Sequence, residues 1–188
     1  MIARLLCLLL YMLIDSMVES FSETIVVRRR LPYVMTPEEA YRNVYQAWKQ
    51  NLGLWFVPPP FILDHGDPDT GVGFVLMRIP PLGLKEGIVG QDRPSENSLR
   101  MTYKVLNPSP FTWPVQDHLG EILLWSDNDK DYLEMEWTVR WTPLGLWIPF
   151  FADALKAITK FIIEYASTYM VELCESYNEE TQRRDTEF

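Results

Sequence analysis

The sequence is poor in the residues on which several common kinds of site depend. It has two cysteines and two histidines among 188 residues, which excludes a disulfide scaffold and a cysteine-rich zinc site. It also lacks the G-x-S-x-G, H-E-x-x-H, C-x-x-C and P-loop patterns. These are the signatures of serine hydrolases, zinc proteases, thiol oxidoreductases and nucleotide-binding loops. We therefore expect neither a metal nor a cofactor.

Positive charge is scarce as well. The net charge is −9, and the only basic runs are Arg28–Arg30 and Arg183–Arg184. A groove that follows a phosphate backbone needs a basic footprint. We therefore expect no nucleic-acid partner.

Long apolar runs are missing except near the N-terminus, where Leu5–Ile14 is apolar. This run is shorter than the roughly 20 residues that span a bilayer, and it has the length of a signal-peptide core. Two interpretations of residues 1–20 stay open. They are a signal peptide, which predicts the secretory pathway, or a spurious extension upstream of a true start at Met17, which predicts a cytoplasmic protein.

The rest of the chain is rich in apolar and aromatic residues, at 47% and 13% of the total, which is enough to build a core. Glu23 to Leu31 has the composition of a strand. Thr36-Pro37-Glu38-Glu39 then predicts a helix start with a capping box. One or two short helices are expected before the triple proline Pro58–Pro60.

Between residues 61 and 142 the helical period disappears and turn signals separate short runs. Alternating apolar residues, such as Leu99, Met101, Tyr103 and Val105, predict a sheet with one apolar and one charged face. The runs link without long connections, as in an antiparallel meander. Strands are expected at 61–66, 72–79, 85–92, 98–106, 118–126 and 131–142.

From about Pro149 to Tyr177 the helical period returns, which predicts one long helix that covers the apolar face of the sheet. Residues 178–188 form a polar tail, and residues 22–177 form one domain. The predicted apolar side of the helix comprises Phe151, Leu155, Ile158, Ile162, Tyr165, Tyr169 and Leu173.

Four ordered segments resemble motifs of the SRPBCC superfamily, which includes START-related lipid-transfer domains, birch-pollen-allergen relatives and polyketide cyclases. They are the glycine pair in Gly71-Val72-Gly73-Phe74, then Leu99–Val105, Pro114–Ile122 and Trp137–Trp141. The resemblance implies an α+β helix-grip fold. In it, a curved antiparallel sheet of about seven strands surrounds a long C-terminal helix and encloses a cavity for a hydrophobic molecule. The sequence departs from the pattern at Leu76, where relatives often carry Arg, and has Arg78 instead.

His118 and Glu86 are the candidates for acid–base chemistry. His118 follows Asp117, a carboxylate of the kind that orients a catalytic histidine, and Glu86 alternates with Ile88 in its strand. His118 shares a strand face with Gly120 and Ile122 in the resemblance. An exposed position is expected for Glu86, because Glu is seldom buried, and His65 is the weaker histidine candidate. The expected ligand-contacting residues are Met101, Tyr103, His118, Trp137, Trp141, Ile158, Ile162 and Tyr165.

We expect a protein that binds a lipid, sterol, isoprenoid or polyketide-like molecule, with transport of that molecule as an accompanying function. Two alternatives remain open: a cyclase or dehydratase that uses His118 or Glu86 in the same cavity, and an interaction module without a pocket. Members of the family serve both purposes, so the fold alone does not decide between a carrier and an enzyme. A carrier is favoured because no catalytic signature is present. The expected partners are a hydrophobic small molecule and, transiently, a membrane surface.

Overall fold

The computed structural model describes residues 22–31, 35–50, 58–78, 83–109, 115–126, 132–143 and 148–186. Residues 1–20, for which two interpretations were open, are outside the described part. The segment 51–57, where a second short helix was expected, is outside it as well. None of the helices in the described ranges combines the length and apolar character needed to cross a bilayer.

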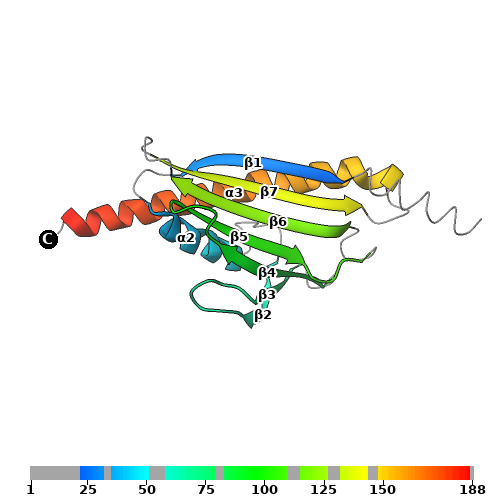
Figure 1. Ribbon diagram of the computed structural model, residues 1–188, viewed down its shortest axis with the longest axis horizontal. Coiled ribbons are helices and arrows are strands. Elements are labelled where there is room, and N and C mark those ends of the chain that lie inside the picture. The colour runs from blue at the N-terminus through cyan, green and yellow to red at the C-terminus, as the bar shows by residue number, and fades with distance from the viewer. Residues whose placement is uncertain are drawn as a thin grey trace, which may run out of the picture.

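Seven antiparallel strands form one curved sheet, as the sequence predicts. Their order across the sheet is β1-β7-β6-β5-β4-β3-β2, so the first strand pairs with the last and the others follow the chain (Figure 1). The strands are β1 (Glu23–Leu31), β2 (Phe61–His65), β3 (Phe74–Arg78), β4 (Leu84–Asp92), β5 (Ser98–Val105), β6 (Val115–Ser126) and β7 (Leu133–Pro143).

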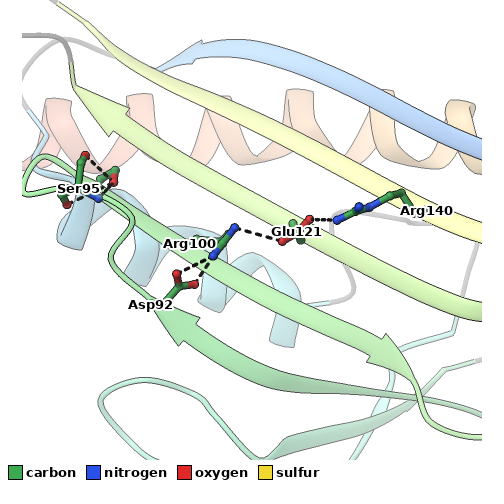
Figure 2. Close-up of polar contacts among 6 residues, drawn as sticks. Asp92, Ser95, Arg100, Glu121 and Arg140 are labelled. Atoms are coloured by element: carbon green, nitrogen blue, oxygen red, sulfur yellow. Dashed lines mark hydrogen bonds and ion pairs between the residues drawn. The ribbon is translucent and has the colours of Figure 1, made fainter.

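The two faces of the sheet differ as predicted. The inner face, which the helices cover, carries the buried apolar residues of β5 and β7. The outer face carries ion pairs that cross the strands (Figure 2). There Arg100 lies 2.7 Å from Asp92 of β4, and Glu121 of β6 lies 2.6 Å from Arg140 of β7. Alternation along each strand therefore gives the sheet one apolar face and one charged face.

Helix α2 (Pro37–Lys49) begins where the capping box predicts. Its Glu39 amide donates to the Thr36 hydroxyl, and the Glu39 carboxylate accepts from the Thr36 amide at 2.8 Å. Its buried side packs against β5 and β6 and ends at Trp48, which is 1% exposed. The long helix is therefore not the sole cover of the sheet.

Helix α3 (Ile148–Thr186) extends past the predicted end at Tyr177, because the following residues include no glycine or proline that would stop it. It packs mainly along β1, and the Lys156 amine lies 2.6 Å from the Glu23 carboxylate. Figure 1 shows it running along the β1 side of the sheet and beyond the end of the strands.

The sequence-based assignment of the buried side of α3 was partly wrong. Ile158 is 52% exposed, while Ile162 and Tyr165 are half-buried. Apolar residues surround much of this helix, so spacing alone did not fix its rotation. Small residues decide the rotation, because they allow the helix to approach its neighbours closely. The fully packed side comprises Leu155, Thr159, Ile163, Ala166, Ser167, Met170 and Cys174.

Candidate functional site

A β-bulge lies at His118, on the inner face of β6. Gln116 pairs with Thr142 and Leu119 with Arg140, so β6 has one more residue than β7 between these pairs. Asp117 takes up the extra residue in the left-handed region at φ 52°, which Asp tolerates better than most residues. His118 alternates with Gly120 and Ile122 onto the inner face, and the extra residue before it lets Val115 face inward as well. Bulges of this kind often re-aim a side chain near a functional site.

His118 is buried against an aromatic ring. Its side chain lies with its ring centroid 5.7 Å from that of Tyr103, and the residue is 9% exposed. Burial lowers the pKa of the imidazole, and the nearby Glu86 carboxylate opposes that effect only in part. The side chain is therefore neutral at pH 7, and its Nδ1 has no hydrogen-bond partner among the described residues.

Tyr103 is the centre of the inner face. Its hydroxyl accepts a hydrogen bond from the Trp137 indole nitrogen at 2.9 Å. Its ring lies across the backbone of Gly120, where a Cβ would come within 1.9 Å of the ring carbon Cζ. Trp48 of α2 covers the other side of the ring, with centroids 4.3 Å apart. Burial raises the pKa of the Tyr103 hydroxyl, which stays protonated.

An ion pair is buried beside this aromatic group. Arg78 of β3 pairs with Glu86 of β4, and their side chains are 7% and 13% exposed. The guanidinium also lies 5.2 Å from the ring centroid of Trp48 and donates to the Trp48 carbonyl oxygen at 3.4 Å. The expected exposed position of Glu86 was wrong, because Arg78 on the next strand compensates its charge.

Two indole nitrogens complete the polar groups of this interior. The Nε1 atoms of Trp48 and Trp141 are buried and, like Nδ1 of His118, have no hydrogen-bond partner in the described part of the chain. Trp141 lies opposite the bulge, between the residues that pair with Gln116 and Leu119. We use the name inner cluster for Tyr103 together with six other residues of this interior: Trp48, Arg78, Glu86, His118, Trp137 and Trp141.

The structure thus gathers most of the sequence-predicted site residues on the inner face, including Met101 at 0% exposure. Their contact with a ligand stays a prediction. Ile158 points outward, and His65 lies exposed on β2 at the edge of the sheet. Sequence reasoning missed Trp48 and Arg78 as site residues. The available signals were the helical spacing of Trp48 from Val44 and the alternation of Arg78 with Phe74 and Leu76.

Two hollows open on the surface beside α2. One, of about 320 Å³, lies between Tyr41, Lys49, Asp69 and Leu99. The other, of about 460 Å³, separates α2 from the C-terminal part of α3 near Gln50. Neither is lined by a residue of the inner cluster.

Comparison with solved structures identifies the architecture. The chain superimposes on a norcoclaurine synthase point mutant from Thalictrum flavum with a TM-score of 0.57 and 15% identity, covering 84% of this chain and 98% of that one. It superimposes on Ara h 8.0201 with a TM-score of 0.52 and 13% identity, covering 80% and 99%. The chain has the helix-grip fold. The fold that the resemblance implies is therefore confirmed.

A third helix-grip structure is the di-domain ARO/CYC StfQ from the steffimycin biosynthetic pathway. Its TM-score is 0.55 with 15% identity, and the match covers 85% of this chain and 52% of that one. No family model and no curated protein matches the sequence. The likeness therefore rests on structure, and at these identities it speaks for the fold alone.

Proposed function

We propose that this helix-grip protein binds a hydrophobic small molecule between the inner face of its sheet and its two helices. The observation that carries the proposal is the composition of that face. It is apolar and aromatic over β1 and β3 to β7, with a few polar groups gathered around Tyr103. Small-molecule sites combine these features, since apolar walls supply affinity and a few polar atoms fix orientation.

Affinity comes mainly from apolar area removed from water, at roughly 25 cal/mol per Å². The inner face needs no charged ligand, because the Arg78 guanidinium is already compensated by Glu86 and His118 is neutral. A lipid, sterol, isoprenoid or polyketide-like molecule fits these requirements. Transient contact with a membrane, from which such a ligand is taken up, belongs to the same proposal.

The test places a larger side chain in the interior and measures the binding of the apolar dye Nile red. Native mass spectrometry shows in addition whether a lipid co-purifies with the protein. Val139 faces inward between Trp137 and Trp141 and is 1% exposed, whereas its neighbour Thr138 lies on the outer face. Val139→Phe is expected to lose most dye binding, and the matched Thr138→Phe to keep it. Circular dichroism verifies that both variants fold.

Equal dye binding by the two variants, or no uptake of any apolar molecule by the wild type, contradicts the proposal. The second result favours an interaction module without a pocket. Native mass spectrometry gives an independent answer if Val139→Phe fails to fold, because a lipid retained by the wild-type protein is visible without any variant.

A second candidate function is acid–base catalysis on a poly-carbonyl substrate in the same interior. It is favoured by His118, a buried neutral imidazole on the inner face of β6, which is suited to accept a proton. Turnover of a synthetic poly-carbonyl thioester by wild type and His118→Gln separates the two functions. An enzyme loses roughly 10²-fold or more in rate, whereas a carrier shows no turnover and retains most of its affinity.

A further inference from the structure

Three buried nitrogen atoms between the sheet and α2 have no hydrogen-bond partner among the described residues: Nε1 of Trp48, Nε1 of Trp141 and Nδ1 of His118. The three residues are 1%, 1% and 9% exposed. Folded proteins seldom leave buried polar atoms unpaired, because each one lost its hydrogen bonds to water on folding. Three of them in one region therefore require an explanation.

The three nitrogens belong to one neighbourhood. Trp48 covers the Tyr103 ring on one side, His118 approaches the same ring, and Trp141 lies opposite the bulge that holds His118. They come from α2, β6 and β7, which are far apart in the sequence. Local backbone geometry therefore does not account for their common position.

The chemistry of these atoms restricts what pairs with them. An indole N–H only donates, so Trp48 and Trp141 each require an acceptor. A neutral imidazole can donate or accept at Nδ1. The only buried carboxylate of the inner cluster, Glu86, is paired with Arg78, so no free anion awaits a ligand amine and no free cation awaits a ligand carboxylate.

We propose that these nitrogens bind neutral acceptor oxygens of the ligand, so that the preferred ligand is an apolar molecule with ketone-type carbonyl groups. This inference rests on the proposed binding function and narrows it. A pure hydrocarbon leaves the two indole donors unpaired, and a protonated amine, which has no acceptor, places donors against donors. A carbonyl oxygen accepts from an indole N–H without bringing a net charge into the interior.

The test uses two fluorescent probes of nearly the same shape. One is a dimethylaminonaphthalene with a propionyl ketone, and the other carries a propyl group in place of the propionyl group. The dissociation constants of both are measured for the full-length wild type, for Trp141→Phe and for Trp125→Phe. Trp125 lies on the outer face of β6 and is half-buried, so it is a matched control.

The quantity compared is the ratio of the two dissociation constants, which cancels the loss of ring volume in each variant. One net hydrogen bond corresponds to roughly a 2- to 10-fold change in binding. Trp141→Phe is expected to reduce the preference for the ketone by about this factor, and Trp125→Phe to leave it unchanged. In nitrogen-15 spectra, the ketone is expected to shift the indole N–H signals of Trp48 and Trp141, and the propyl probe is not.

An unchanged ratio in Trp141→Phe, together with unshifted indole signals, overturns the inference and leaves the proposed binding function intact. In that case the three nitrogens form hydrogen bonds with water and not with the ligand. If neither probe binds the wild type, both the binding function and this inference are overturned. The indole spectra require no substitution, so they decide the matter even if Trp141→Phe does not fold.

Discussion

Removing one partner of the buried ion pair is expected to destabilise the protein strongly. The side chains of Arg78 and Glu86 are 7% and 13% exposed, so Glu86→Leu leaves a guanidinium with little water to solvate it. Loss of one partner of such a pair costs about 3–5 kcal/mol. The remaining contacts of Arg78 with Trp48 place the expected value near the lower end, at about 3 kcal/mol.

The size of this effect is readily measured. For a protein of 150–250 residues, 1 kcal/mol corresponds to roughly 2–4 °C in melting temperature, so Glu86→Leu should lower it by about 6–12 °C. Urea unfolding, followed by tryptophan fluorescence and by far-ultraviolet circular dichroism, gives the free energy. Agreement of the two signals supports a two-state analysis.

Two further variants make the prediction specific. The double variant Arg78→Met/Glu86→Leu removes both charges and is expected to recover most of the lost stability, because no buried charge remains. Asp92→Asn breaks the exposed pair with Arg100 on the outer face (Figure 2) and should cost less than about 1 kcal/mol. If Glu86→Leu alone costs no more than Asp92→Asn, or the double variant is no more stable than the single one, the reasoning is refuted.

Three other predictions concern the same interior. Gly120→Ala is expected to destabilise the protein by about 2 kcal/mol or more in urea unfolding, because its Cβ overlaps the Tyr103 ring; a loss below about 0.5 kcal/mol contradicts this contact. His118 should titrate in proton NMR spectra below its usual pKa of 6.5. Its lowered pKa in the folded state contributes stability that is present above pH about 6.5 and is lost as the pH falls through the folded pKa, because the unfolded chain takes up the proton first. His118→Gln should flatten that part of the pH–stability curve, and an unchanged slope counts against a buried neutral imidazole. Burial raises the pKa of the Cys174 thiol to about 11, so iodoacetamide at pH 8 should label Cys174 only after urea is added. Peptide mass spectrometry measures the labelling, and rapid labelling of the native protein excludes the buried position.

The sequence predicted what local periodicity controls. The structure confirms the strands between residues 61 and 142, the inward side of β5 and β7, and the start of α2. These features depend on alternation and capping, which involve only residues close together in the sequence. The common face of His118, Gly120 and Ile122 came from the family resemblance. Its structural cause is the alternation along β6, whereas the bulge at Asp117 has no recognisable sequence signal.

What the sequence could not supply depends on contacts between distant elements. Trp48 was placed on the apolar side of α2, yet only the packed structure shows that it covers Tyr103. The burial of Glu86 depends on a pairing with Arg78 across β3 and β4. The rotation of α3 depends on where small residues such as Ala166 allow a close approach, so Ile158 was assigned to the wrong side.

The pairing of β1 with β7 also constrains how the chain reaches its native state. Arg28 and Glu136, which form an ion pair across these strands, are separated by 108 positions in the chain, and α3 packs on the same first strand. During synthesis, β1 therefore has no strand to pair with until β7 has left the ribosome. Since contacts between distant residues slow folding, we expect this protein to fold late and slowly, with β1 exposed to chaperones in the meantime.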